Sequence, residues 1–227
     1  MALKQKKMKQ VLAAVKEVNW KWATFMFNTV TFLAYGLDEH NFASDPRLLS
    51  NERDTIRYSS ILLGIAGVHY SVLDVSKLSV ESEILIRYSD WLLTTPLLLK
   101  TLGAFYQFPA AVTNELVIYN VLMIAFGFLY ELSGNHLYWT VGTAAYLLIV
   151  YRLNQALAGR DKTLFYRYFL FGWSMYGLVS LLPVEKRTLP YNVLDTYNKL
   201  VFAMDIRRRI VENIANRPAG PAGPVPG

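Results

Sequence analysis

The chain contains no cysteine among its 227 residues, which excludes disulfides, thiolate metal sites and cysteine nucleophiles. Its three histidines (His40, His69 and His136) lack the spacing of metal ligands, so no metal site is predicted. Charged residues are scarce at 18%, against about 25% in an ordinary soluble domain. Hydrophobic residues reach 53%. This balance argues against a soluble domain and favours a membrane protein.

Seven apolar runs are long enough to cross a membrane as helices, which takes roughly 20 residues each. We expect the spans at 18–37, 55–75, 83–103, 110–131, 137–157, 163–182 and 190–211. The connections are short, and several contain Pro or Gly. The predicted fold is an all-α membrane protein, a seven-transmembrane-helix bundle over residues 18–212.

The two ends differ from the spans. Residues 1–17 are Lys-rich and are interpreted either as an amphipathic surface helix or as a solvated tail. No cleavable signal peptide is expected, because the first apolar run is long enough to span. Residues 213–227 are rich in Pro and Gly and are predicted to be a disordered tail.

Basic residues lie mostly at segment ends, where membrane proteins keep them, so the net charge of +6 does not indicate nucleic acid. With the N-terminus outside, twelve Lys and Arg fall on cytoplasmic segments and nine on external ones. The positive-inside rule therefore favours, by a small margin, a multi-pass protein of the cell membrane with the N-terminus outside and the C-terminus cytoplasmic.

Ionisable residues near the middle of a membrane helix are costly, so they indicate function. Arg87 and Asp90 are three residues apart, and Asp195 and Lys199 are four apart, so each pair shares a helix face. One interpretation is a salt-bridged quartet that fixes helix packing. The other is a lysine that holds a carbonyl compound as a Schiff base, because burial frees its nucleophilic amine.

The segment RYSDWLLTTPLLL at 87–99 resembles the third helix of microbial (type 1) rhodopsins. Further similarity to proteorhodopsins lies in the seventh span (Tyr191, Asn192, Asp195, Asn198 and Lys199), the sixth (Trp173 and Tyr176) and the second (Gly64, Ile65, Ala66, His69 and Tyr70). The resemblance covers all seven spans. It implies a proteorhodopsin-like protein, not an enzyme, with all-trans retinal in the centre of the bundle.

The resemblance also implies roles for single residues. Lys199 would bind retinal as a protonated Schiff base, and Asp90 would be its primary counterion and proton acceptor. Asp195 would be the second counterion, and Arg87 would hold a water network on the extracellular side of both. His69 and Thr94 would each contact Asp90.

The implied retinal pocket combines aromatic and small side chains. Its members are Trp91, Thr95, Leu98, Trp173, Tyr176 and Asn198. Leu98 goes with green absorption in proteorhodopsins. Trp20, Trp22 and Trp139 lie near span ends and are interpreted as interfacial anchors.

The sequence departs from outward proton pumps of this family eleven residues after the acceptor. Such pumps usually carry a carboxylic acid there as proton donor, about 16 Å along the helix. Here the position is Thr101. We therefore expect slow reprotonation and a slow photocycle.

Arg57 lies twelve residues before His69, at about the depth of Thr101. It either snorkels to the cytoplasmic headgroups or is buried, where its charge would oppose proton entry. A buried arginine there would make the chain similar to the cryorhodopsin subgroup. Asp205 is interpreted as a substitute donor or, preferably, as a partner of Arg208 or Arg209.

Two functions remain open at this stage. One is a light-driven proton transporter; the other is a photosensory rhodopsin with a long-lived deprotonated state and a cytoplasmic signalling partner. The basic ends of spans 5–7 would offer such a partner an acid-binding surface. Asp90 argues against a chloride pump, and the absence of an Asn-Asp-Gln triad argues against a sodium pump. A light-gated channel would need more buried acids, and a non-retinal seven-helix protein is the residual case. The expected partners are lipid, protons and further copies in a trimer or pentamer.

Overall fold

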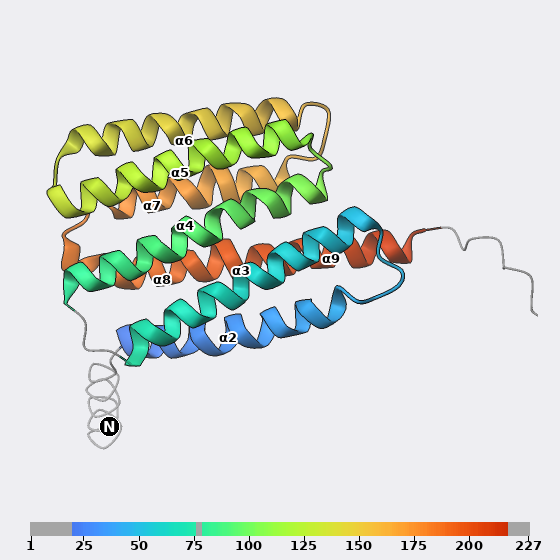
Figure 1. The fold of residues 1–227 in the computed structure, drawn as a ribbon, viewed down its shortest axis with the longest axis horizontal. Helices are drawn as coiled ribbons and strands as arrows, with labels where there is room; N and C mark the ends of the chain where they lie inside the picture. Colours follow the sequence, from blue (N-terminus) through green and yellow to red (C-terminus); the bar gives the residue numbers. More distant parts are fainter. Residues whose placement is uncertain (1–19, 76–78, 218–227) are drawn as a thin grey trace, which may run out of the picture.

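The computed structural model describes residues 20–75 and 79–217, and the regular elements within these ranges are all helices. The described helices form seven rods, each made of one helix or of consecutive helical segments. Five rods are single helices: α2 (Trp20–Phe42), α3 (Ser50–Val75), α4 (Val80–Phe105), α5 (Ala110–Ser133) and α6 (His136–Ala156). The rods lie side by side along the long axis of the molecule (Figure 1).

The last two rods are composite. One joins the π-helical segment η1 (Phe165–Gly172) to α7 (Trp173–Val179). The other joins α8 (Thr188–Asp195), the π-helical segment η3 (Thr196–Val201) and α9 (Phe202–Ala215), and the 3-10 turn η2 (Val184–Lys186) precedes it. π-Helical turns are often found at functional sites, and η3 carries Lys199.

The prediction of seven helices is confirmed, because each predicted span overlaps one rod of the described chain. The ends differ: α2 runs five residues past the predicted limit, and α9 continues through 213–215, which the sequence assigned to the tail. Residues 1–17 and 218–227 lie outside the described residues.

The distribution of apolar and charged side chains between surface and interior is the reverse of that in a soluble protein. Large apolar side chains on the outer surface are more than half exposed, among them Phe27, Ile61, Leu85, Ile118 and Leu147. Buried positions include Arg87, Asp90, Asp195 and Lys199. By length and composition alone, two described helices qualify as membrane spans, Ser50–Leu73 and Ala110–Ser133. Charges placed inside the bundle lower the hydropathy of α4 and of the last rod without exposing charge to lipid.

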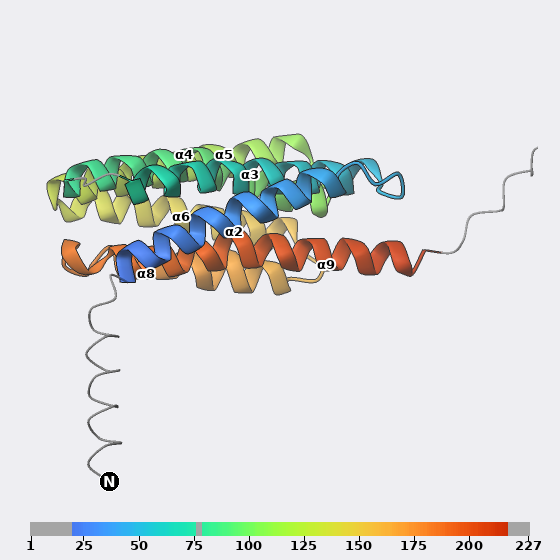
Figure 2. The same ribbon diagram turned by 90° about the horizontal axis from the view of Figure 1, so that it is seen from below.

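Helix α4 defines two halves of the bundle that are used below. The Arg87 half surrounds the beginning of α4 and the beginning of α8, and the Thr101 half surrounds the end of α4 and α9. The two halves lie at opposite ends of the long axis (Figures 1 and 2).

Candidate functional site

Lys199 lies between two buried acids. Its Nζ is in direct hydrogen-bonding contact with Asp90 Oδ2 and lies 3.4 Å from Asp195 Oδ2. None of the three side chains is more than 3% exposed. A buried ammonium needs such a counter-charge to remain ionised. The structure therefore brings together the three residues that the sequence placed at the centre of the chemistry.

Asp195 is surrounded by fixed hydrogen-bond donors from three other helices. It accepts from the Tyr70 hydroxyl (2.7 Å), from Trp91 Nε1 (3.0 Å) and from the Tyr176 hydroxyl (2.6 Å). Hydrogen bonds to an ionised acceptor are among the stronger ones in proteins. With Lys199 as well, this carboxylate has enough partners to remain an anion in the interior.

Asp90 has fewer partners than Asp195. Its Oδ1 has no hydrogen-bond partner in the described part of the chain. His69 Nδ1 approaches that oxygen to 3.8 Å, a near contact, and lies 3.0 Å from the Ile65 carbonyl. Thr94 does bond Asp90, but its hydroxyl donates to the main-chain carbonyl (2.8 Å) rather than to the carboxylate. Asp90 therefore depends on Lys199 for its stability as an anion.

Arg87 reaches Asp195 only through intermediates. Its Nη1 donates to Asn192 Oδ1 (3.2 Å), an oxygen that also lies 3.4 Å from the Tyr70 hydroxyl. Its guanidinium lies 5.4 Å from the centre of the Tyr191 ring. Nη2 has no protein partner among the described residues, which fits the predicted water network. Asn192 thus joins Arg87 to the Tyr70 hydroxyl, a contact that the sequence analysis did not predict.

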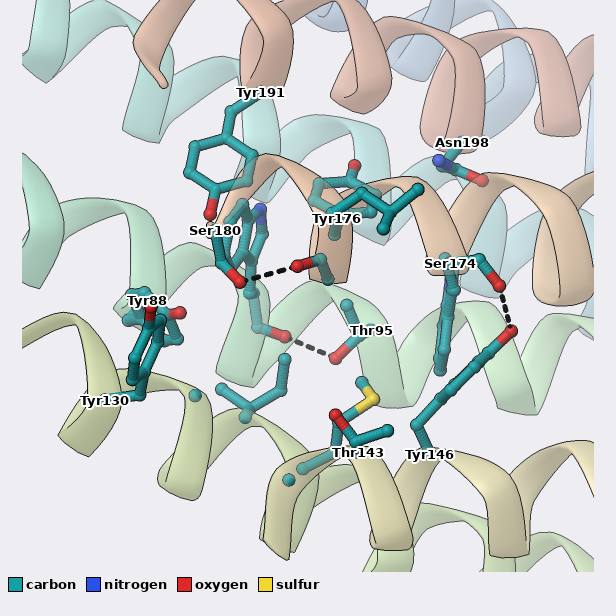
Figure 3. Close-up of a pocket in the computed structure, with 18 of the residues that line it drawn as sticks. Tyr88, Thr95, Tyr130, Thr143, Tyr146, Ser174, Tyr176, Ser180, Tyr191 and Asn198 are labelled. Carbon is teal, nitrogen blue, oxygen red and sulfur yellow. Dashed lines mark hydrogen bonds between the residues drawn. The ribbon is translucent and has the colours of Figure 1, made fainter. Parts of the chain in front are cut away.

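A cavity of about 310 Å³ adjoins Lys199. All six pocket residues that the resemblance implied line it: Trp91, Thr95, Leu98, Trp173, Tyr176 and Asn198. The structure adds further lining residues, among them Tyr88, Met123, Gly127, Tyr130, Thr143 and Tyr146 (Figure 3). Tyr146 on α6 and Ser174 on α7 are linked by a hydrogen bond (2.8 Å).

Trp139 corrects the sequence analysis. It was interpreted as an interfacial anchor, but it lines the cavity, and its Nε1 donates to Ser180 Oγ (3.2 Å). A tryptophan near a helix end is consistent with either place, and only the packing of α6 against α7 decides between them. The side chains of Trp20 and Trp22 lie outside the described ones.

The cavity fits a long apolar aldehyde attached to Lys199. Its walls are largely aromatic and aliphatic, and the amine that would form the bond is buried beside an acid. Thr95 donates to Asn120 Oδ1 on α5 (2.8 Å), which ties the polar side chain in the wall to a partner. Retinal bound through Lys199 would lie here.

The acids and bases of the Thr101 half do not reach this site. Thr101 is fully buried and donates to the Leu97 carbonyl (2.8 Å), so it has no proton to pass to a neighbour without breaking that bond. Asp205 pairs with Arg208 (2.8 Å) and Arg209 (3.4 Å), as the preferred interpretation predicted. Arg167 also lies 3.4 Å from Asp205, and an acid held as an anion by three arginines is a poor proton donor.

Arg57 overturns one expectation. The interpretation of a buried arginine in the cytoplasmic half is wrong, because Arg57 is exposed on the outer surface of α3. Its depth along the helix follows from the sequence, whereas the direction in which it points depends on how α3 is rotated in the bundle. The similarity to cryorhodopsins, which rested on a buried arginine, loses its support.

The basic ends of spans 5–7 are largely neutralised within the chain. Arg209 pairs with Asp161 (2.6 Å), Arg152 pairs with Glu115 (2.6 Å), and Arg207 pairs with Asp38. The surface therefore offers an acidic partner less free charge than the sequence suggested.

The chain is similar to known proteins over most of its length. The family model described as bacteriorhodopsin-like protein matches residues 17–211. The green-light absorbing proteorhodopsin of Gamma-proteobacterium EBAC31A08 is 26% identical over 206 residues, covering 77% of this chain and 81% of the relative. Cruxrhodopsin-3 of Haloarcula vallismortis is 38% identical over 166 residues, 63% of each chain.

Among solved structures, the blue light-absorbing proteorhodopsin from Med12 superposes with a TM-score of 0.75 at 22% identity, covering 88% of this chain and all of the other. That likeness concerns the fold, and the family match covers nearly the whole described chain. The chain therefore belongs to the bacteriorhodopsin-like family and is a seven-helix, retinal-binding membrane protein driven by light.

Proposed function

We propose that this protein is a light-driven proton transporter in which the proton passes from the Lys199 nitrogen to Asp90 and returns slowly. Bound retinal supplies light absorption and isomerisation, which change the proton affinity and direction of that nitrogen. The remaining steps depend on side chains of this chain.

The difference between the two acids carries the proposal. Asp195 accepts three hydrogen bonds from fixed donors, whereas Asp90 Oδ1 has no partner within the described residues. A buried anion without partners gains most from protonation. Asp90 is therefore the acid that takes the proton, and Asp195 remains charged and keeps the pocket in place.

Direction follows from the expected orientation. With the N-terminus outside, the Thr101 half faces the cytoplasm, where Arg207, Arg208 and Arg209 satisfy the positive-inside rule. A proton taken up on the Thr101 side and released past Arg87 would then leave the cell. Assembly into a trimer or pentamer in the cell membrane is proposed on the family resemblance.

Flash photolysis of the retinal-loaded protein tests the acceptor. In the wild type we expect a near-ultraviolet band, which marks deprotonation of the Lys199 nitrogen, and recovery over seconds. Asp90→Asn should abolish that band. Asp195→Asn is the matched control and should still form it, although with a less stable pigment. A near-ultraviolet band of normal size in Asp90→Asn would refute Asp90 as acceptor.

A photosensor with little net transport is the second candidate. It is favoured by Thr101, which stands where a donor acid is expected and binds only a carbonyl. A light-induced pH change in a suspension of vesicles separates the two. Sustained acidification or alkalinisation supports transport, whereas a single-turnover signal that does not accumulate supports sensing.

A further inference from the structure

Glu39 is a buried acid that the proposed cycle does not yet use. It lies on α2 near the end of the helix, in the Thr101 half, and is 0% exposed. Neither carboxylate oxygen has a hydrogen-bond partner among the described residues. Burying an ionised carboxylate in this way is costly, so the favoured dark form is the neutral acid, which carries a proton.

The nearest charge is Arg207 on α9. Its Nη1 lies 3.6 Å from Glu39 Oε1 but is hydrogen-bonded to the neighbouring, exposed Asp38. The guanidinium also lies 4.5 Å from the centre of the Phe42 ring and 5.7 Å from that of Tyr35, a titratable residue one turn before Glu39. Arg207 is thus held against α2 with two acids in reach.

This arrangement can stabilise Glu39 in both protonation states. While Arg207 bonds Asp38, Glu39 remains neutral. Once Glu39 loses its proton, a small shift of the guanidinium supplies a charge-assisted hydrogen bond to the new anion. Because the Arg207 guanidinium can stabilise its anionic form, Glu39 can release a proton and later recover one from the solvent.

The position of Glu39 suits the return of a proton. Arg207 comes eight residues after Lys199, a rise of about 12 Å along the helix between their Cα atoms, and Glu39 lies beside Arg207. Leu99 and Phe202, each at most 1% exposed, are apolar residues of the same half. Ser60 donates to the Gly36 carbonyl (2.8 Å), which lies one turn before Glu39 on α2, so a buried polar group lies near Glu39.

We propose that Glu39 is the proton donor that returns the proton to the Lys199 nitrogen, in place of the acid missing at Thr101. The inference rests on the proposed function. The O–H bond of Glu39 breaks, the proton crosses along water molecules that enter the Thr101 half, and a new N–H bond forms at Lys199. Glu39 remains as an anion paired with Arg207 until the solvent reprotonates it.

Glu39→Gln in the full retinal-loaded chain tests the proposal by the decay of the near-ultraviolet band. We expect decay about 100-fold slower than in the wild type, the lower end of what a positioned proton-transfer group contributes. Azide, a small diffusible acid, should restore much of the rate. Glu39→Asp keeps the acid and should retain a rate between those of the wild type and Glu39→Gln.

The matched control is Glu52→Gln. Glu52 is a buried glutamate in the same half, but it bonds Arg217 and the Leu49 amide (2.9 Å), so it is held as an anion. Its replacement should change the decay by less than about twofold, since it supplies no proton. An intact visible band in the dark shows that each variant is folded.

A second readout needs neither light nor retinal. Infrared spectra of the retinal-free protein should show a carboxylic-acid C=O band that Glu39→Gln lacks and Glu52→Gln retains. Unchanged decay in Glu39→Gln, or no missing band, would overturn the assignment of Glu39. Failure of the wild type to form the near-ultraviolet band would instead refute the proposed function, and the donor role with it.

Discussion

The Arg87 half and the Thr101 half of the bundle differ in how their buried polar side chains are connected. In the Arg87 half, the Asn192 side-chain amide donates to the Thr24 hydroxyl (2.8 Å), and the Asn192 main-chain carbonyl accepts from the Asn28 side-chain amide (3.2 Å). Asn28 in turn accepts from Thr196 (2.6 Å). Buried side chains here form a connected polar network next to Asp195.

The Thr101 half also buries polar side chains, but Glu39 and Ser59 have side-chain oxygens without a hydrogen-bond partner among the described residues. Leu99, Leu102, Phe202 and Ile206 are each at most 1% exposed, and Thr101 spends its hydroxyl on its own helix. A proton crosses hydrogen-bonded groups readily but crosses hydrocarbon only when water enters. Hydrogen-bonded groups are thus connected on the Arg87 side and interrupted on the Thr101 side, so the return of the proton should set the rate of the cycle.

The largest expected effect comes from adding an acid to the Thr101 half. Thr101→Glu places a carboxyl group at the depth where pumps of this family carry their donor. Recovery of the visible band should accelerate by about 100-fold or more, as expected for a positioned proton donor. Flash photolysis measures it, with Thr101→Gln as the control of equal size. Equal rates in the two variants would mean that the missing acid does not limit the return.

Replacing Asn192, which lies at the centre of the hydrogen-bond network in the Arg87 half, should lower the thermal stability of the protein. Asn192→Leu deprives Arg87 of its hydrogen-bond acceptor and removes the amide that donates to the Thr24 hydroxyl, whereas Asn28 keeps its bond to the main-chain carbonyl of residue 192. Loss of a hydrogen bond to a buried charge costs about 1.5–3 kcal/mol. Thermal melting followed by loss of the visible band measures this. Ser59→Ala, also at a buried polar position but in the other half, should shift the melting temperature much less.

The ion pairs at the end of the Thr101 half should matter little and should not depend on pH in the usual range. Hydrogen bonds from Thr163 and the nearby Arg209 lower the pKa of Asp161, in the loop before the sixth rod, to about 2. The stability this provides is present above the ordinary aspartate pKa of about 3.9 and is lost as pH falls through the lowered value.

Asp161→Asn should therefore cost less than about 1 kcal/mol, because the pair is half-exposed and screened by salt. Melting temperatures at several pH values above 5 should differ from the wild type by one constant offset. An offset that grows within that range would show that another group titrates with the pair.

The smallest expected effect is at Arg57. Because its side chain is exposed, Arg57→Gln should leave recovery within about twofold of the wild type, which is the scatter expected of a group outside the proton path. The matched substitution Arg207→Gln should slow recovery, since Arg207 reaches Glu39. A change of recovery rate much larger than twofold in Arg57→Gln would show that Arg57 takes part in the return of the proton.

The seven helices, the central charges and the pocket motif can all be predicted from the amino-acid sequence. Buried charges in apolar runs have few explanations, and the spacing of Asp195 and Lys199 places them on one face of any helix. The six implied pocket residues line the cavity for the same reason, since each belongs to a motif that fixes both its depth and its face.

The packing of the helices sets the outward direction of Arg57, the place of Trp139 in the pocket and the burial of Glu39 beside Arg207, 168 residues away. It also placed Gly172 where a Cβ would lie 2.1 Å from Asn198 Oδ1. Helical periodicity gives the depth of a residue and its neighbours on the same helix. The rotation of each helix, and so the helix it contacts, results from packing between segments far apart in the chain.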